Sequence, residues 1–393
     1  MEKRVASVLA LLIAAGGCSS SRGADVEMKS ASGETVTIRL PKGYPGPILA
    51  PDGTACMWPD LRFAAQEGVP AEFQSLDLIT PRSVLDALEA RANGKSAEET
   101  PLGRRPVVVY IHGGGFSSGS KRGGLESKVA SVLGAGYLLA SINYRLGPTP
   151  PRIERPVPAE RSDRADRPIS PEREERRKAM EATRAEREAI RATIPSFMHP
   201  AQIEDTAAAI AWLREHAPEF GGAPDGFILL GHSAGAHLAA LLATDERWLA
   251  RHGLGFGVIA GVVALDGAGY DLEQRSEGEE FAERKLAAVF SADRAAWADA
   301  SPVNHVAAGK GIPPFLLFQA GDKEISIAAA ARFSGKLAEA GVPVEVFHAT
   351  HHSHGSINRD FGTPVDPVTV RFLEFANAVT AGAASSTSQR IEH

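Results

Sequence analysis

The chain has 393 residues, of which 44% are hydrophobic and 23% are charged, and its formal net charge at pH 7 is −6. This length and apolar content are enough to build a sizeable hydrophobic core. The negative net charge argues against a nucleic-acid-binding protein, which would normally present a basic surface, so we predict no nucleic-acid partner. The sequence carries no signal of oligomeric state.

Residues 1–17 have the pattern of a bacterial signal peptide. Basic residues precede the apolar run from Val8 to Ala15, which is too short to span a bilayer, and small residues follow it. The run Ala15-Gly16-Gly17-Cys18 resembles a lipobox, which implies a lipidated Cys18 after cleavage. Plain secretion is the alternative, because such boxes usually carry leucine where Ala15 stands. We therefore expect export to the cell envelope, with membrane contact only through an N-terminal lipid anchor, or otherwise a periplasmic or secreted protein.

Strand-like and helix-like segments alternate between residues 33 and 380. Most of the strand-like segments are continuous apolar runs, which suit strands buried on both faces of a sheet. This pattern predicts an α/β domain with a mostly parallel central sheet flanked by helices. Residues 18–32 are expected to form a flexible tether, 41–58 a loop rich in Pro and Gly, and 381–393 a disordered tail. The strands are expected at 35–40, 73–79, 106–111, 137–143, 227–230, 258–265, 314–318 and 344–347, and the helices at 125–133, 201–216, 236–242, 328–340 and 368–378.

A charged insertion at 148–195 interrupts this alternation. Residues 172–193 have almost no apolar face, and oppositely charged side chains recur at three- or four-residue spacing, as in a solvated helix. An exposed insertion is the favoured interpretation. A lid or docking arm is the alternative, because the segment leaves the domain soon after Asn143-Tyr144-Arg145-Leu146.

The most informative motif is Gly231-His232-Ser233-Ala234-Gly235, which follows an apolar run and precedes a helical segment. This context indicates a strand-to-helix turn that presents a nucleophilic serine. A serine hydroxyl needs an adjacent base to act as a nucleophile near neutral pH. Ser233 is therefore the candidate nucleophile, and the backbone N–H of Ala234 is a candidate donor to an oxyanion.

A second glycine-rich motif, His112-Gly113-Gly114-Gly115-Phe116, comes directly after the run at 106–111. A glycine run after a strand allows backbone N–H groups to turn toward a developing oxyanion. Gly113 and Gly114 are the candidate donors, with Ala234 completing the oxyanion hole. We expect His112 to brace this loop rather than to act as the base.

Four histidines follow the run at 344–347, namely His348, His351, His352 and His354. One of them is expected to be the base that serves Ser233. A metal site is the alternative for such a cluster, but no cysteine lies near it and one histidine is already required by the serine. We predict no metal.

The acid that orients the base is expected after the run at 314–318, where Asp322 and Glu324 compete. The order serine, acid, histidine along the chain suits a hydrolase with either acid. Asp266, after the run at 258–265, is an outside candidate that we interpret mainly as part of a turn.

Together these motifs resemble the α/β-hydrolase superfamily, in particular bacterial esterases and lipases near the hormone-sensitive-lipase-like and arylformamidase-like enzymes. The resemblance covers residues 73–378 apart from the insertion. It implies Glu324 as the acid, with Asp322 as the alternate, because members often place the acid three residues after a glycine. It also implies His354 as the base, with His351 in reserve, because His354-Gly355-Ser356-Ile357 matches the family pattern.

The function that these residues predict is a serine hydrolase without a cofactor. A carboxylesterase would cleave short acyl, aryl or carbohydrate-linked esters through an acyl-enzyme. An arylformamidase-type amidase is the alternative within the same fold. A non-catalytic surface binding protein is the alternative from another class.

Overall fold

The computed structural model describes residues 25–29, 35–39, 46–149, 193–278 and 280–390, with scattered helical positions between 172 and 183. The expected signal peptide, Cys18 and most of the charged insertion lie outside these residues. Two strands, β1 (Asp25–Lys29) and β2 (Thr35–Arg39), form a separate antiparallel pair. Part of the segment expected to be a tether is therefore a strand.

The central element of the fold is a nine-stranded sheet with the order β11-β10-β9-β8-β6-β7-β5-β4-β3. The six strands from β6 to β11 run parallel, whereas β5, β4 and β3 continue the sheet in antiparallel fashion at one edge. The mostly parallel sheet predicted from the sequence is thus confirmed. Its strands are β3 (Ile48–Leu49), β4 (Ala55–Arg62), β5 (Ser75–Pro81), β6 (Val107–Ile111), β7 (Leu138–Ile142), β8 (Phe227–His232), β9 (Ile259–Leu265), β10 (Phe315–Ala320) and β11 (Val344–Ala349).

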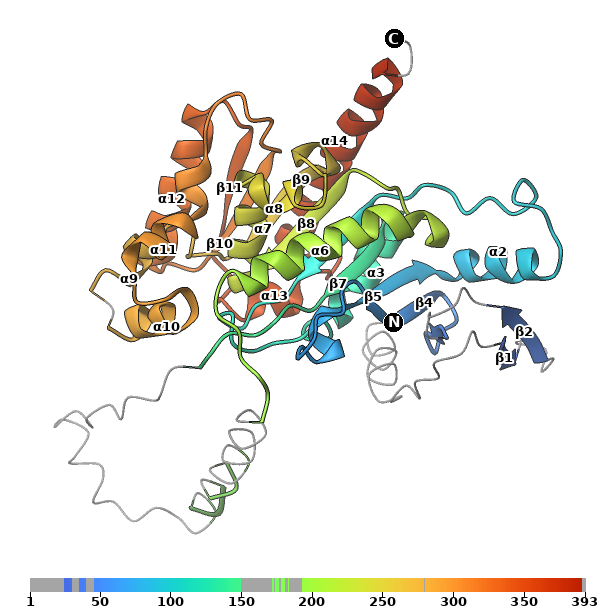
Figure 1. Cartoon of the computed structure of the whole chain (residues 1–393), viewed down its shortest axis with the longest axis horizontal. Helices are drawn as coiled ribbons and strands as arrows, with labels where there is room; N and C mark the ends of the chain where they lie inside the picture. Colours follow the sequence, from blue (N-terminus) through green and yellow to red (C-terminus); the bar gives the residue numbers. More distant parts are fainter. Residues whose placement is uncertain are drawn as a thin grey trace.

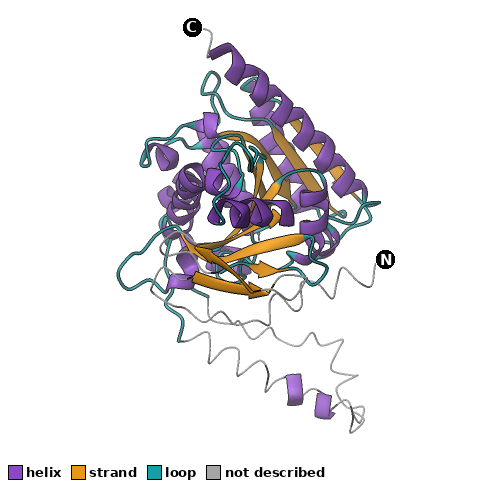
Figure 2. Ribbon diagram, turned by 90° about the vertical axis from the view of Figure 1, so that its right-hand side faces the viewer, coloured by secondary structure: helices purple, strands orange, loops and turns teal. Residues whose placement is uncertain are grey.

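Helices cover both faces of this sheet, so that the strands lie between two helical layers (Figures 1 and 2). The α-helices are α2 (Arg82–Ala92), α3 (Glu126–Gly134), α6 (Ala201–His216), α7 (Ala234–Thr244), α8 (Arg247–Ala250), α9 (Leu272–Ser276), α10 (Glu280–Phe290), α11 (Arg294–Asp299), α12 (Glu324–Glu339), α13 (Ser356–Asp360) and α14 (Pro367–Arg390). Short 3₁₀ helices occur at Ala71–Gln74, Ala217–Phe220, Phe256–Val258 and Pro302–His305.

The two faces of the sheet bury separate hydrophobic clusters. Along β6, Val107, Val109 and Ile111 pack with residues of α6, α7 and α12, whereas Val108 and Tyr110 pack with residues of α3, α13 and α14. Successive side chains of a strand point to opposite faces, so an uninterrupted apolar run is what a strand between two helical layers requires. Burying each such side chain stabilises the fold by about 1.5–3 kcal/mol.

Strand β4 lies partly in the segment expected to be a loop. It contains Pro59, which cannot donate a ladder hydrogen bond and therefore argues against a strand when only the sequence is considered. The structure accommodates the proline with a register shift between Trp58 and Leu61 and a positive φ of 54° at Asp60. This β-bulge is a local feature that apolar periodicity does not indicate.

The C-terminal helix also differs from the expectation. Helix α14 continues to Arg390, whereas we expected the domain to end at residue 380 and a disordered tail to follow (Figure 1). Residues 391–393 lie outside the described part of the chain.

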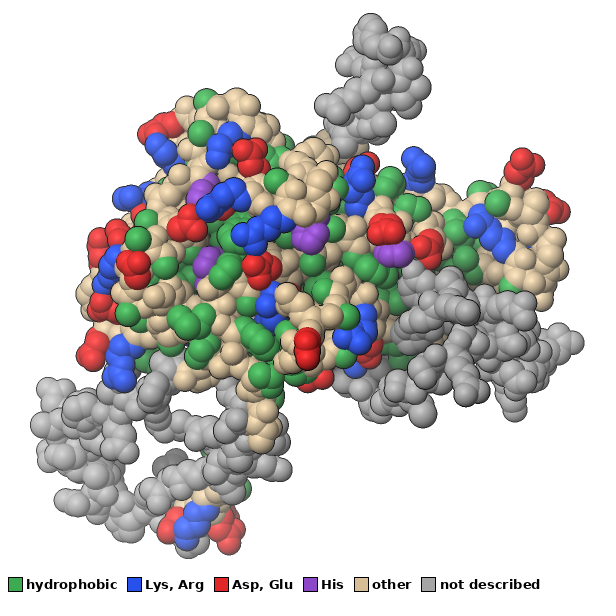
Figure 3. Space-filling view, viewed as in Figure 1, with side chains coloured by type: hydrophobic (Ala, Val, Ile, Leu, Met, Phe, Trp, Pro, Cys, Tyr) green, Lys and Arg blue, Asp and Glu red, His purple; other side chains and the backbone are tan. Residues whose placement is uncertain are grey.

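Basic and acidic side chains are interspersed on the face of the molecule shown in Figure 3. Among the described helices, none combines the length and the apolar character needed to cross a membrane.

Candidate active site

Ser233 lies at the sharp turn between β8 and α7, with φ 55° and ψ −113°. This conformation is rare for a residue with a side chain and is typical of functional sites. The flanking glycines make the turn possible. A Cβ atom at Gly231 would lie 2.2 Å from the carbonyl oxygen of Gly235, and a Cβ at Gly235 would lie 2.0 Å from that of Ile111. The spacing of the motif is therefore a steric requirement of this turn.

His354 and Asp266 continue a hydrogen-bonded chain that starts at Ser233. The Nε2 atom of His354 lies 3.0 Å from the Oγ of Ser233, and its Nδ1 lies 2.6 Å from Oδ2 of Asp266. The second carboxylate oxygen of Asp266 accepts a hydrogen bond from the N–H of Ala320 at 3.0 Å. The Asp266 side chain is almost fully buried, whereas that of His354 is 43% exposed. The imidazole thus contacts the hydroxyl with one nitrogen and a fixed carboxylate with the other.

Neither of the expected acids takes part in this series of hydrogen bonds. The prediction that Glu324 or Asp322 is the partner of His354 is therefore wrong. Both residues are exposed after β10, and Asp322 lies 3.6 Å from His348 instead. Asp266 follows β9, which is the direct neighbour of β8, whereas β10 is one strand further away. The outside candidate is therefore the carboxylate that reaches His354.

The glycine run after β6 lies directly against the serine. A Cβ at Gly113 would lie 3.1 Å from the Cβ of Ser233, and one at Gly114, where φ is 115°, would lie 2.0 Å from the carbonyl oxygen of Ser118. Side chains at these positions would therefore prevent the close approach. Within the described residues, the N–H of Gly114 has no hydrogen-bond acceptor. Ala234 begins α7, and the first N–H groups of a helix have no acceptor inside it.

His112 braces this loop. Its Nδ1 donates to the carbonyl oxygen of Gly113 at 2.7 Å, and its ring stacks on Tyr144 with a centroid distance of 4.3 Å. The Tyr144 hydroxyl donates in turn to the carbonyl oxygen of His112 at 2.9 Å. Burial lowers the pKa of His112 to about 4, which keeps the ring neutral near pH 7.

His232 contacts the candidate base, a role that the sequence analysis did not assign. Its Nε2 donates to the backbone carbonyl oxygen of His354 at 2.9 Å, and the two ring centroids are 4.8 Å apart. Burial lowers the pKa of His232 to about 4, so the ring is a neutral donor at pH 7. His232 thereby holds the backbone that carries the His354 imidazole.

The other three histidines of this region, of which His348 lies in β11 and His351 and His352 follow it, do not converge on the serine. His348 contacts the carbonyl oxygen of Gly321 at 2.9 Å, and the Nε2 of His352 lies 3.0 Å from Asp366. His351 is exposed. In the part of the chain that the structure describes, no group of three or more His, Cys, Asp or Glu residues is arranged to hold a metal ion.

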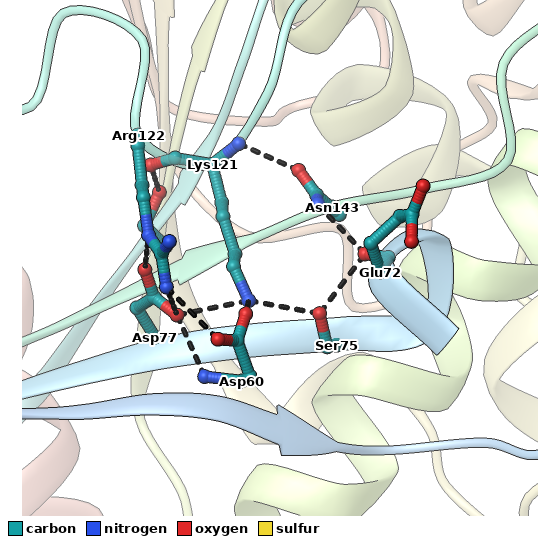
Figure 4. A network of polar contacts seen from close by, with 8 residues as sticks. Asp60, Glu72, Ser75, Asp77, Lys121, Arg122 and Asn143 are labelled. Atoms are coloured by element: carbon teal, nitrogen blue, oxygen red, sulfur yellow. Dashed lines mark hydrogen bonds and ion pairs between the residues drawn. The ribbon is translucent and has the colours of Figure 1, made fainter. Parts of the chain in front are cut away.

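An ionic network, in which Lys121 and Asp77 are buried and Asp60 and Arg122 are partly exposed, fixes the segment that follows the glycine run (Figure 4). The Nζ of Lys121, whose side chain is 3% exposed, lies 2.8 Å from Asp77 and 2.6 Å from Asp60. Arg122 contacts the same two carboxylates at 2.7 and 3.1 Å. Burial would raise the pKa of Asp60, but its hydrogen bond and charge interaction with Lys121 hold that pKa below the ordinary value. The network thus attaches this segment to β4 and β5.

The profile of the BD-FAE family matches residues 97–163 and 192–337, which is more than half of the chain. The chain belongs to the BD-FAE family. The matched ranges contain the glycine run, Ser233 and Asp266, whereas His354 lies beyond them.

Relatives of this BD-FAE protein include bacterial esterases. It is 28% identical to "Carboxylesterase NlhH" of Mycobacterium tuberculosis over 142 residues, which is 36% of this chain and 30% of that protein. The match therefore spans less than two thirds of the relative's length.

Solved structures share the fold. "Esterase B" from Lactobacillus rhamnosis, inhibited by a tributyrin phosphonate, superposes with a TM-score of 0.59 at 16% identity, covering 85% of this chain and 89% of that one. A "carbohydrate esterase from gut microbiota" superposes with a TM-score of 0.56 at 16% identity, covering 85% and 99%. The BD-FAE protein thus has the α/β-hydrolase fold predicted from its motifs.

Proposed function

We propose that this protein is a serine carboxylesterase in which Ser233, His354 and Asp266 form the catalytic triad. The observation that carries the proposal is the position of His354, which contacts the Ser233 hydroxyl and the buried Asp266 carboxylate with its two ring nitrogens. Membership of the BD-FAE family and the similarity of this chain to a carboxylesterase support the same reaction.

In the first step, the Oγ of Ser233 attacks the carbonyl carbon of the ester while Nε2 of His354 takes its proton. Asp266 accepts the hydrogen bond from Nδ1–H, which keeps the unprotonated nitrogen toward the serine and stabilises the imidazolium that forms. The carbonyl oxygen becomes an oxyanion as the new carbon–oxygen bond forms. The N–H groups of Gly113, Gly114 and Ala234 are the proposed donors to it.

In the second step, the His354 imidazolium gives its proton to the departing alcohol oxygen, which leaves an acyl-enzyme on Ser233. Water then attacks the acyl carbon while His354 takes a proton from it. Collapse of this intermediate releases the carboxylic acid and returns the proton to Ser233. These steps use only groups of the chain and water.

The proposed substrates are short acyl or aryl esters and ester groups on carbohydrates. Carbohydrate esters are included because this chain shares its fold with a protein named as a carbohydrate esterase. A panel at neutral pH tests the class with p-nitrophenyl esters of increasing chain length, acetylated and feruloylated sugars, and N-formylkynurenine. Ester turnover and labelling of Ser233 by a fluorophosphonate are expected. Preferential turnover of the formamide would establish the amidase alternative, and no turnover or labelling would favour a binding protein.

We also propose that the protein is exported and anchored through a lipid on Cys18, on the basis of the N-terminal pattern alone. Membrane fractionation and metabolic lipid labelling of the full chain test this proposal. Cys18→Ala is expected to abolish both signals, and their retention would contradict the anchor.

A further inference from the structure

Lys128, in the first turn of α3, is completely buried. Its Nζ donates to the backbone carbonyl oxygens of Gly124 and Asn358, both at 2.6 Å. It also lies over two aromatic rings, 4.9 Å from the centroid of Tyr110 and 5.5 Å from that of Phe361. Among the described residues, no carboxylate forms a salt bridge with it. Lys128 is thus a buried amine held by carbonyl oxygens and aromatic faces.

These contacts join Lys128 to the segment that carries His354. Asn358 lies one helical turn after His354, in α13, and the N–H of Arg359 donates to the carbonyl oxygen of Gly355 at 3.1 Å. The Tyr110 hydroxyl donates to Oδ1 of Asn358 at 2.9 Å, and the Ser127 hydroxyl donates to the carbonyl oxygen of Arg359 at 2.9 Å. The first turn of α3 and the end of β6 therefore both bind α13.

The His354 segment is consequently held on two sides. His232 binds the carbonyl oxygen of His354 itself, and Lys128 binds that of Asn358, four residues later. Between these two points the helical turn has little freedom to move. A shift of about 1 Å in a reacting group can lower the rate about 100-fold, so this restraint bears directly on proton transfer.

Stability alone is a poor explanation for a lysine at this position. Burial lowers the pKa of Lys128 to about 7, which shows that the site opposes the charged form. A cation near the N-terminus of a helix is also unfavourable. An apolar residue of similar length would avoid both costs, but it would leave the two carbonyl oxygens without a donor.

We propose that Lys128 is a positioning residue that holds the α13 turn so that His354 stays within hydrogen-bond distance of Ser233. This inference rests on the proposed esterase function. The charged and titratable groups around Lys128 are Glu126 on its own helix, Tyr110 from β6 and His232 from β8, while Arg359 and Asp360 on α13 pair with each other at 2.8 Å.

The test compares Lys128→Met with a control variant, Tyr137→Phe. The control removes a 2.6 Å hydrogen bond to Asn377 in α14, away from His354. With p-nitrophenyl acetate, Lys128→Met is expected to lower kcat about 10- to 100-fold with KM changed less than about twofold. Tyr137→Phe is expected to leave both quantities unchanged.

A folded Lys128→Met variant with unchanged kcat would overturn the inference, as would an equal loss of kcat in Tyr137→Phe. If Lys128→Met does not fold, Tyr110→Phe is the second test, because it removes the hydroxyl that binds Asn358 at 2.9 Å and, more weakly, the carbonyl oxygen of Gly123 at 3.3 Å. Its expected effect is a fall in kcat of about threefold to tenfold at constant KM, and an unchanged kcat would overturn the inference.

A crystal structure provides a readout that does not need activity. In Lys128→Met, or in Tyr110→Phe if the former does not fold, the distance from Nε2 of His354 to Oγ of Ser233 is expected to exceed the 3.0 Å of the unmodified protein by about 0.5 Å or more. An unchanged distance would contradict the positioning role. Absence of hydrolysis by the unmodified protein would count against the esterase proposal instead, and the crystallographic comparison would still test Lys128.

Discussion

The Nδ1 atom of His354 lies 2.6 Å from Oδ2 of Asp266, although 88 residues separate them in the chain. The contact joins the end of β9 to the turn before α13. Asp266 itself is fixed by its backbone N–H, which donates to the carbonyl oxygen of Phe318 at 2.8 Å. The carboxylate is therefore in place before any substrate binds, which is the preorganisation that a catalytic acid requires.

Gly114→Ala is expected to lower kcat about 100-fold, as loss of an oxyanion donor does. The added methyl group would lie 2.0 Å from the carbonyl oxygen of Ser118, and φ is already 115°, so the loop must move. Gly136→Ala is the matched control, because Gly136 also has a positive φ, of 87°, but has open space around its Cβ position. Steady-state hydrolysis of p-nitrophenyl acetate measures both variants. Equal losses in the two would show that backbone strain, rather than the oxyanion loop, lowers the rate.

Conformational stability is expected to fall as the pH drops from about 6.5 to about 4. Burial lowers the pKa values of His112, His232 and His237 to about 4 in the folded state, whereas the unfolded chain takes up protons near pH 6.5. The unfolded state binds more protons in this window, so stability increases with pH across it. Each histidine contributes up to about 3 kcal/mol of this change. Urea unfolding at pH 7, 6, 5 and 4.5 measures the slope, and His237→Phe should reduce it. A flat profile would contradict the neutral buried histidines.

Lys121→Met is expected to lower the free energy of unfolding by about 3–5 kcal/mol. The substitution leaves the fully buried Asp77 without its 2.8 Å partner, although Arg122 retains a contact with it. Lys310→Met, at an exposed lysine that donates to the carbonyl oxygen of His305, is the control and should change stability by less than about 0.5 kcal/mol. Chemical denaturation measures the free energy of unfolding of both variants. Equal values would show that the network in Figure 4 contributes little to stability.

The features of the fold and the site that were predictable are those set by residues close together in the sequence. Continuous apolar runs indicate strands buried on both faces, and the two glycine motifs indicate the turns that they form, because steric requirements act between residues close in sequence. The place after the last strand indicates a histidine base but leaves four candidates, and the resemblance to the hydrolase family favours His354 among them. The structure brings Ser233, His354 and the glycine run together as expected.

The acid partner was not predictable in the same way. Choosing between Asp266 and Glu324 depends on which strands are neighbours in the sheet and on how far the turn before α13 reaches back across it. Neither property is local, and both acids stand at the end of an apolar run. The same holds for Lys121 and Lys128, whose partners lie 61 and 230 residues away in the chain. Lysines are usually exposed, and no local pattern indicates that these two are buried.

The identity of the acid is tested most directly by comparing kcat/KM of Asp266→Asn with that of Glu324→Gln on p-nitrophenyl acetate, with folding checked by circular dichroism. Asp266→Asn is expected to lower kcat/KM by about 10²- to 10⁴-fold, because the amide no longer fixes the tautomer and charge of His354. Glu324→Gln is expected to stay within about threefold of the unmodified protein, because Glu324 is exposed and makes no contact with His354. Loss of activity in Glu324→Gln, with Asp266→Asn fully active, would contradict the triad proposed here.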